Sequence, residues 1–313
     1  MYYLGIDLGG TNIVAGLVDA DCKIVETVSC KTNLPRPASE IIDDMASLCA
    51  QVIEKAGITK DQVSYVGIGC PGTCNGDTGI VEYSNNLKFD KLPLTEMMTK
   101  GLGKPVFVDN DANVAALGEV KFGAAKEYND AVMLTLGTGV GGGIILDGQV
   151  YSGFNYAGAE LGHMVIEKDG RQCSCGRRGC IEAYASATAI IRDTRKMAER
   201  HPESIINQLV NGDLSKVNGK TAFDAMRAGD KWGKKIVDNY IKYLGEGIIN
   251  FINIFQPDII LIGGGISKEG DTLLIPLRRY VFKYAYGSKF LKRSKIACAT
   301  LGNDAGIVGA AML

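Results

Sequence analysis

Two segments of this chain repeat one pattern: an apolar strand, a turn of glycine and threonine, a second apolar strand and an acid. The first segment runs from Leu4 to Asp19 and the second from Val132 to Asp147. Self-similarity of this kind predicts two lobes that are built on one supersecondary theme. The length of 313 residues agrees, because it favours two domains of roughly 150 residues each.

Glycine marks the turns of this chain. There are 40 glycines among 313 residues, where roughly 7% is usual. The clusters at 9–10, 137–143 and 263–265 each follow an apolar, β-branched run, so we expect tight turns that leave strands. The remaining pattern predicts helices at 40–56, 110–122 and 304–313, helical periodicity from 186 to 254, and strands at 63–68, 105–108 and 258–262. Alternating strands and helices indicate an α/β protein.

The turns Gly9–Thr11 and Gly137–Gly139 are candidate phosphate sites. Glycine lets backbone N–H groups approach phosphate oxygens closely, and threonine adds a hydroxyl donor. Either turn alone is equally consistent with a purely structural role. Gly137, Gly139 and Gly142 also fit G-x-G-x-x-G, but strand-like residues follow where a dinucleotide fold needs a helix. The chain has no G-x-x-x-x-G-K-[ST] segment, so we do not expect a P-loop.

Two groups of polar residues follow predicted strands. Asp7 ends the first strand beside Gly9–Thr11, where its carboxylate could hold Mg²⁺ through water, or simply be solvated. The segment Asn110–Asn113 lies between a strand and a helix, where open α/β sheets place their chemistry. Asp109, Asn110 or Asp111 could instead cap the helix, but three candidates for one cap leave others for function.

A tetrahedral Zn²⁺ site is the strongest local prediction. Its ligands would be His163, Cys173, Cys175 and Cys180. The chain has only two histidines, and His163 lies ten residues before Cys173. A disulfide or unrelated core thiols are the alternatives. Four protein ligands make a structural site, which we expect to fix Glu160, His163 and Glu182 around a polar ligand.

Charge and composition exclude several classes of function. With 34 basic and 35 acidic residues the net charge is −1, so we expect neither nucleic acid nor a membrane as a partner. The chain start has no basic n-region, and the apolar run from 131 to 146 is interrupted by glycines and threonines, so we expect a cytoplasmic protein without a membrane span. Cys22, Cys30, Cys49 and Cys298 have no partner pattern and are expected to be small core residues.

Five motifs together resemble the ROK family, named for repressors, open reading frames and kinases, and in particular its glucokinase-like members. They are the phosphate motifs at 5–12 and 137–144, the segment Asn110–Asn113, Glu160-x-Gly162-His163, and the cysteine motif from Cys173 to Glu182. The resemblance spans essentially the whole chain.

The resemblance implies an α/β, two-domain actin/hexokinase-like (ribonuclease H-like) ATPase fold with a cleft between the domains. We expect the smaller domain to comprise residues 1–118 and a C-terminal helix at about 302–313, and the larger one residues 119–301 with the zinc-binding loop. Members often form homodimers or homotetramers.

The resemblance also implies an activity: ATP-dependent phosphorylation of the 6-hydroxyl of a hexose, as a step of carbohydrate metabolism such as glycolysis. Glucose is the first expectation, with N-acetylglucosamine, N-acetylmannosamine, mannose or fructose as alternatives. The implied catalytic base is Asp111, and the sugar contacts are Gly72, Asn85, Asn86, Asn110, Asp111, Glu160, His163 and Glu182. ATP and Mg²⁺ would be bound by Gly5, Asp7, Gly9, Gly10, Thr11, Asn12, Gly137, Thr138, Gly139, Gly264 and Gly265, and the structural Zn²⁺ by His163, Cys173, Cys175 and Cys180.

Two functions other than catalysis remain to be weighed. ROK repressors resemble these kinases but carry an N-terminal helix-turn-helix, for which we expect no room because the first strand begins at Tyr2 or Tyr3. A non-catalytic sugar sensor would not need Asp111 and both phosphate turns.

Overall fold

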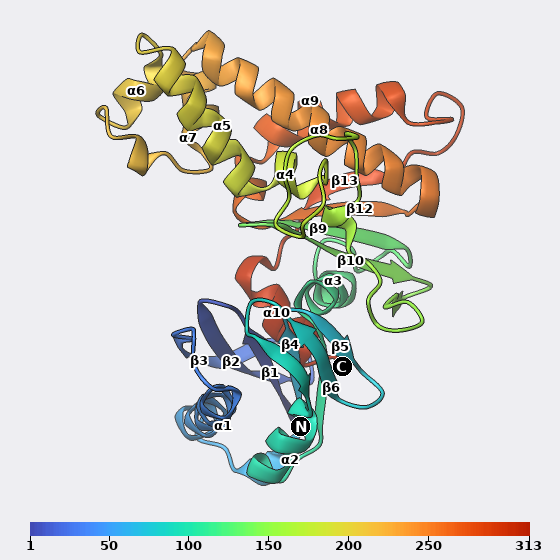
Figure 1. The fold of residues 1–313 in the computed structure, drawn as a ribbon. Coiled ribbons are helices and arrows are strands. Elements are labelled where there is room, and N and C mark those ends of the chain that lie inside the picture. The colour runs from blue at the N-terminus through green and yellow to red at the C-terminus, as the bar shows by residue number, and fades with distance from the viewer. The chain divides into compact units, whose positions relative to one another are not determined.

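The computed structural model describes all residues from Met1 to Leu313, and its elements are labelled in Figure 1. The first sheet has the order β3-β2-β1-β4-β8. Its strands are β1 (Tyr2–Leu8), β2 (Asn12–Asp19), β3 (Ile24–Lys31), β4 (Val63–Cys70) and β8 (Val106–Asn110). The pairs β1–β2 and β2–β3 are antiparallel, whereas β1–β4 and β4–β8 are parallel.

A second sheet has the order β11-β10-β9-β12-β13. Its strands are β9 (Ala131–Leu136), β10 (Val140–Leu146), β11 (Gln149–Val150), β12 (Ile259–Gly263) and β13 (Lys295–Cys298). The outer pair β10–β11 is antiparallel, and β9–β12 and β12–β13 are parallel. The predicted repeat is thus present as two sheets of like order. Since β10 is a strand, the dinucleotide-fold alternative, which needs a helix after Gly142, is excluded.

A small third sheet is formed by β5 (Thr73–Asn75), β6 (Ile80–Ser84) and β7 (Phe89–Leu92) in that order. Neighbouring strands of this sheet are antiparallel.

The chain divides into two compact units. Unit 1 comprises residues 1–129, 143–159 and 300–313, and unit 2 comprises residues 130–142 and 160–299. One division falls inside β10, after Gly142. The domain boundaries expected from the sequence, 1–118 with 302–313 and 119–301, stay a prediction about the folding domains.

Unit 1 packs helices on both faces of its five-stranded sheet. Leu4, Ile6 and Leu8 of β1 alternate onto the face that α1 (Ala38–Lys55) and α2 (Leu94–Leu102) cover, and there they join one buried core. On the other face lie α3 (Asp111–Phe122) and α10 (Ala305–Ala310). A β-carbon on Gly5 would lie 2.0 Å from the carbonyl oxygen of Ile307. The backbone of α10 therefore packs directly against the backbone of β1.

Unit 2 is organised around α8 (Lys231–Phe255), which contacts α4, α5, α7 and α9. These and the remaining helix are α4 (Glu182–Ala185), α5 (Ala187–Arg200), α6 (Ile205–Leu209), α7 (Thr221–Arg227) and α9 (Asp271–Tyr284). The region from Ala187 to Phe255, where the sequence predicts helical periodicity, is mainly helical, but residues 201–204, 210–220 and 228–230 connect its four helices.

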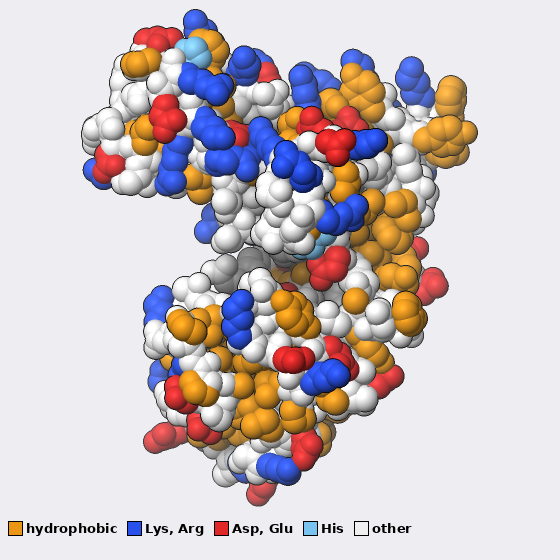
Figure 2. Space-filling model, viewed as in Figure 1, with side chains coloured by type: hydrophobic (Ala, Val, Ile, Leu, Met, Phe, Trp, Pro, Cys, Tyr) orange, Lys and Arg blue, Asp and Glu red, His pale blue; other side chains and the backbone are white.

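Charged side chains of both signs are interspersed over the face of unit 1 in Figure 2, and basic ones are more frequent over the helices of unit 2. No helix combines the length and the apolarity that crossing a lipid bilayer requires.

Candidate active site

The first glycine turn joins β1 to β2 and leaves two backbone N–H groups unused. The N–H of Gly9 donates to the carbonyl of Asn12 at 2.9 Å, whereas those of Gly10 and Thr11 donate to no backbone carbonyl. Thr32, which is fully buried, braces this turn from outside. Its hydroxyl donates to the carbonyl of Gly9 at 2.7 Å, and its N–H donates to that of Thr11 at 2.9 Å. The carbonyls of Gly9 and Thr11 thus accept hydrogen bonds from Thr32, whereas the N–H groups of Gly10 and Thr11 remain available. A turn with available N–H groups suits an anion.

The second glycine turn, between β9 and β10, has the same design within unit 2. The N–H of Gly137 donates to the carbonyl of Gly139 at 3.0 Å, and the N–H groups of Thr138 and Gly139 donate to no backbone carbonyl. Two residues at the start of α5 donate hydrogen bonds to the carbonyls of this turn. The N–H of Ala187 donates to Gly137 O at 2.8 Å, and the Thr188 hydroxyl donates to Thr138 O at 2.8 Å. Each unit thus carries one turn with open amides.

Thr32 and Thr188 were not among the residues expected from the sequence. They lie 23 and 50 positions from the carbonyls that accept their hydroxyls, so no local motif includes them.

Two partly buried carboxylates, Asp7 and Asp111, lie close to each other in unit 1, at the end of β1 and at the start of α3. The pKa of Asp7 is raised to about 6, mainly by burial and secondly by the charge of Asp111. Burial also raises the pKa of Asp111, although its bonds with backbone N–H groups oppose that change. Gly306 leaves room for Asp7, because a β-carbon there would lie 2.9 Å from the carboxyl carbon. These two side chains are the strongest acid–base candidates of unit 1.

Asn110 is the residue that caps α3, which the sequence left open among three candidates. Its side-chain oxygen accepts from the N–H groups of Ala112 at 2.8 Å and Asn113 at 3.2 Å. Its side-chain nitrogen donates to Gly72 O at 3.0 Å. One N–H of this amide remains for a substrate. Asp111 Oδ1 also accepts from the N–H of Ala112, at 2.9 Å.

Asp109 lies beside this cap and was expected only as an alternative capping residue. Its carboxylate accepts from the side-chain nitrogen of Asn113 at 3.0 Å. Burial raises its pKa, and that hydrogen bond opposes the change.

Four further predicted residues of unit 1 are Gly72, Asn85, Asn86 and Asn12. Gly72 has a φ of +116°, and a β-carbon there would lie 2.2 Å from the carbonyl of Tyr83. Only glycine fits at this turn. Asn85 accepts from the Tyr83 hydroxyl at 3.3 Å, and the Cβ of Asn86 lies 4.0 Å from a β-carbon placed on Gly10. The Asn12 side chain accepts from the Lys31 ammonium at 2.8 Å.

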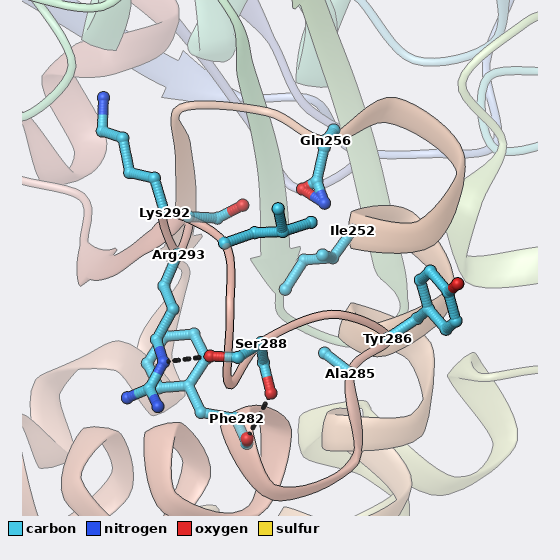
Figure 3. Close-up of a pocket in the computed structure, with 10 residues that line it drawn as sticks. Ile252, Gln256, Phe282, Ala285, Tyr286, Ser288, Lys292 and Arg293 are labelled. Carbon is cyan, nitrogen blue, oxygen red and sulfur yellow. Dashed lines mark hydrogen bonds between the residues drawn. The ribbon is translucent and has the colours of Figure 1, made fainter.

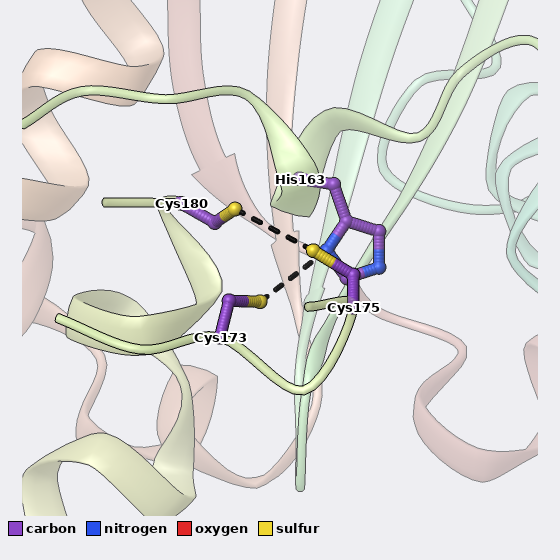
Figure 4. A group of neighbouring side chains, drawn as sticks. All are labelled: His163, Cys173, Cys175 and Cys180. Carbon is purple, nitrogen blue, oxygen red and sulfur yellow. Dashed lines mark hydrogen bonds between the residues drawn. The ribbon is translucent and has the colours of Figure 1, made fainter. Parts of the chain in front are cut away.

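Unit 2 brings the four predicted metal ligands together, as Figure 4 shows. The side-chain donor atoms of His163, Cys173, Cys175 and Cys180 all lie within 4.8 Å of one another. Cys175 Sγ and Cys180 Sγ are 3.8 Å apart, and Cys173 Sγ is 3.6 Å from His163 Nδ1. Zinc–sulfur bonds of about 2.3 Å and zinc–nitrogen bonds of about 2.0–2.1 Å in a tetrahedron give separations of about 3.8 and 3.6 Å. The residues therefore fit a zinc ion, and the nine cysteines form no disulfide.

The histidine of this cluster uses its two nitrogens differently. Nδ1 faces Cys173, and Nε2 lies 3.9 Å from a carboxylate oxygen of Glu160. Nδ1 is thus the nitrogen that would bind a metal, which would leave Nε2 for Glu160 or for a ligand.

Glu182, the first residue of α4, connects the cysteine loop with the second glycine turn. One carboxylate oxygen accepts from the N–H of Val140 at 3.0 Å. The other accepts from the Ser174 hydroxyl at 2.7 Å.

The third glycine cluster follows β12. Gly264 has a φ of +81°, and a β-carbon there would lie 2.4 Å from the carbonyl of Leu136, which directly precedes the second turn. A β-carbon on Gly265 would meet open space. Gly264 and Gly265, which the ROK resemblance implies as ATP residues, therefore lie beside the second phosphate turn, inside unit 2.

A pocket elsewhere in unit 2 contains none of the predicted residues (Figure 3). Two of its polar groups are paired: Arg293 Nε donates to Ser288 O at 2.8 Å, and the Ser288 hydroxyl donates to Phe282 O at 2.6 Å. The buried Ser294 hydroxyl, which also lines the pocket, has no hydrogen-bond partner.

Comparison with known proteins decides the family. The ROK family model matches residues 3–313. The chain belongs to the ROK family. A glucokinase of Thermotoga maritima is 40% identical over 311 residues, which cover 99% of this chain and 96% of that protein. A xylose repressor of Bacillus subtilis, also similar, is 29% identical over 98% of this chain and 75% of its own length.

Among solved structures, a ROK family glucokinase from Streptomyces griseus, in complex with glucose and AMPPNP, superposes with a TM-score of 0.86. It is 34% identical, and the match covers 100% of this chain and 98% of that one. The actin/hexokinase-like α/β fold that the ROK resemblance implies is confirmed.

Proposed function

We propose that this protein is an ATP-dependent hexose kinase of the glucokinase type, which phosphorylates the 6-hydroxyl of glucose. The observation that carries the proposal is the arrangement in unit 1: a turn with open amides, Gly9–Thr11, directly follows β1, and β1 carries Asp7, whose pKa the charge of Asp111 helps to raise. The glucokinase relatives and the solved glucokinase with glucose and AMPPNP support it from outside the chain.

Asp111 acts on the accepting hydroxyl. Its carboxylate accepts a hydrogen bond from the 6-hydroxyl and aims the oxygen at the γ-phosphorus. The new P–O bond forms as the bond to the β-phosphate oxygen breaks, and the hydroxyl proton passes late to Asp111. Because burial raises the pKa of Asp111, this carboxylate is a better proton acceptor than an exposed one, although alignment supplies much of the rate.

Phosphate oxygens are held by the free N–H groups of both glycine turns. Gly5, Asn12, Gly264 and Gly265 are proposed to complete the nucleotide site. Mg²⁺, when bound, would neutralise phosphate charge. Asp7 is proposed as the carboxylate near this cation. Burial and the charge of Asp111 raise its pKa to about 6, and a nearby positive charge would oppose this shift and favour the ionised form.

Sugar recognition is proposed for Gly72, Asn85, Asn86 and Asn110 of unit 1 and for Glu160, His163 and Glu182 of unit 2. Carboxylates and amides offer the acceptors and donors that hydroxyl patterns require. Hexoses share most of these hydroxyls, so the choice of sugar has to be measured.

ADP formation from ATP, followed with and without sugar, tests the proposal. We expect ADP only when a hexose is present, and the highest kcat/KM with glucose within a panel of glucose, mannose, fructose, N-acetylglucosamine and N-acetylmannosamine. If another sugar of the panel gave the highest kcat/KM, the proposed substrate would change, but the proposed reaction, phosphorylation of a hexose by ATP, would stand. ATP hydrolysis that ignores every sugar would overturn the kinase proposal.

A structural Zn²⁺ ion is the second part of the proposal. The cluster distances match tetrahedral coordination, and four protein ligands leave no open position for catalysis. The ion would hold His163 so that Nε2 faces the sugar.

Cys175→Ser tests this zinc site. We expect purified wild type to contain about one zinc per chain, and the variant to lose both zinc and glucose affinity, as measured by metal analysis and calorimetry. Cys49→Ser, at a buried cysteine outside the cluster, is the matched control and should keep its zinc. Wild type without zinc that phosphorylates glucose normally would contradict the assignment.

A sugar-responsive regulator is the second candidate, favoured by the match to a xylose repressor. It would bind sugar without consuming ATP. The ADP assay therefore separates the two functions.

A further inference from the structure

Glu182 joins two parts of unit 2 that have separate proposed roles. Its Oε2 accepts from the N–H of Val140, the residue after the second glycine turn, at 3.0 Å. Its Oε1 accepts from the Ser174 hydroxyl at 2.7 Å. Ser174 lies between the two metal ligands Cys173 and Cys175. A continuous chain of hydrogen bonds thus runs from the metal loop to the phosphate turn.

The turn is shaped around this carboxylate. A β-carbon on Gly139 would lie 2.3 Å from Glu182 Oε2, so a side chain at this position and the carboxylate exclude each other. Hydrogen bonds to a charged acceptor are stronger than those between neutral groups. The bond to Val140 therefore helps to fix the end of the turn whose other N–H groups, those of Thr138 and Gly139, are free for phosphate.

At the other end, the position of Ser174 depends on the cysteine loop. Cys173 N donates to Arg177 O at 2.9 Å, and Gly176 N donates to Cys173 O at 3.2 Å, so the loop is a tight turn. Ser174 and Cys175 are nonetheless exposed. Cys173 and Cys175, which flank Ser174, both belong to the metal cluster. A bound ion would therefore fix the residues on either side of the Ser174 hydroxyl.

We propose that Ser174 and Glu182 are positioning residues that couple occupancy of the Cys/His metal site to the shape of the turn Gly137–Val140, so that the metal strengthens nucleotide binding. This inference rests on the proposed function in one respect, that the turn binds phosphate. It goes beyond it, because the proposed zinc role concerns only the sugar.

Glu182 has room for a sugar contact as well. A carboxylate has about four acceptor positions. Val140 and Ser174 take two, and Cys173 Sγ lies 3.6 Å from Oε1. A sugar hydroxyl would use one of the remaining acceptor positions of Glu182, not the one that Ser174 occupies. Loss of the hydrogen bond from Ser174 should therefore change nucleotide binding more than sugar binding.

Ser174→Ala is the direct test, because it removes the donor to Glu182 and keeps all four metal ligands. We expect the Kd for AMPPNP, measured by calorimetry without turnover, to rise about three- to tenfold, the range expected when one hydrogen bond to a charged group is lost at an exposed site. The KM for ATP should rise by the same factor, with kcat within about twofold. Ser174→Thr keeps a hydroxyl and should restore tight binding.

Ser215→Ala is the matched control. Its hydroxyl donates to Asp213 at 2.6 Å, also at an exposed site of unit 2. This variant should bind AMPPNP as wild type does.

Metal removal tests the coupling itself. Wild type stripped by a chelator, then dialysed, should bind AMPPNP about three- to tenfold more weakly than zinc-loaded protein, and hydrogen exchange should quicken in the peptide that contains Val140. If Ser174→Ala loses its zinc, the comparison of zinc-loaded with stripped wild type still tests the coupling.

The outcomes separate the two proposals. Equal AMPPNP affinity of the zinc-loaded and stripped protein, or of zinc-containing Ser174→Ala and wild type, overturns the coupling and leaves the kinase untouched. Failure of zinc-loaded wild type to bind AMPPNP at all overturns the proposed function instead.

Discussion

Asp7 and Asp111 determine the charge of the site in unit 1. Both are partly buried, and each has a raised pKa; for Asp7 the value is about 6. Near neutral pH, two neighbouring carboxylates without a cation repel each other. The ligand-free protein should therefore be less stable than the same fold without one of them.

Asp7→Asn should reveal this repulsion as a dependence of stability on pH. The pKa of Asp7 is 3.8 ordinarily and about 6 in the folded protein, so between these values the folded state binds more protons than the unfolded state. Wild-type stability contributed by Asp7 is then present below about pH 4 and lost as the pH rises through about 6. Asn does not ionise, so the variant should gain about 2–3 kcal/mol over wild type at pH 7.5 and little at pH 4.

Urea unfolding of both proteins without nucleotide or Mg²⁺ measures this difference. A stability difference that stays constant between pH 4 and pH 7.5 would show that Asp7 titrates normally.

Some residue roles could be predicted from the sequence, and others could not, for a physical reason. The grouping of His163, Cys173, Cys175 and Cys180 was predictable, because thiol and imidazole side chains at this spacing, with glycines that permit sharp turns between them, are typical of a metal site. Thr32 was not, because it directly follows β3 and reaches Gly9 from 23 positions away in the sequence. The cap of α3 was ambiguous because Asp109, Asn110 and Asp111 share the same capping chemistry.

Glycine explains how α10 packs in unit 1. Gly5 of β1 and Gly67 of β4 are register partners. A β-carbon would lie 2.0 Å from Ile307 O at the first position and 1.8 Å from Ala310 O at the second. Gly5 was expected as a nucleotide residue, and this packing gives a second reason for glycine there.

Gly67→Ala should therefore destabilise unit 1, because the backbone of α10 would have to move away from the sheet. We expect a loss of about 1–3 kcal/mol in the free energy of unfolding. Gly101→Ala is the matched control: its β-carbon meets nothing within 4 Å, and Gly101 lies in the helix α2, so it should be neutral or gain about 0.5–1 kcal/mol. Urea titrations compare the variants. A loss at Gly101 equal to that at Gly67 would remove the packing explanation.

Element positions followed from the sequence where periodicity was strong. The pattern predicts a helix at 40–56 and a strand at 63–68, and α1 and β4 occupy Ala38–Lys55 and Val63–Cys70. The small sheet of β5, β6 and β7 was missed, because its strands have only three to five residues and lie among turn-forming residues.

At the scale of the molecule, one theme is used twice. The sheets β3-β2-β1-β4-β8 and β11-β10-β9-β12-β13 correspond strand by strand, and each has its glycine turn between the equivalent strands. The weak repeat in the sequence predicts this arrangement. The division between the units was not predictable at residue level, because one boundary lies inside the continuous strand β10, where no linker composition marks it.

The central claim is that Asp111 makes this chain a hexose kinase, and one comparison tests it most directly. ADP formation at saturating ATP and glucose should fall about 10²–10⁴-fold in Asp111→Asn, while AMPPNP binds both proteins with similar affinity. Wild-type ADP formation should stop when glucose is left out. Asp111→Asn turnover close to that of wild type, or wild-type ATP consumption that does not depend on sugar, would contradict the claim.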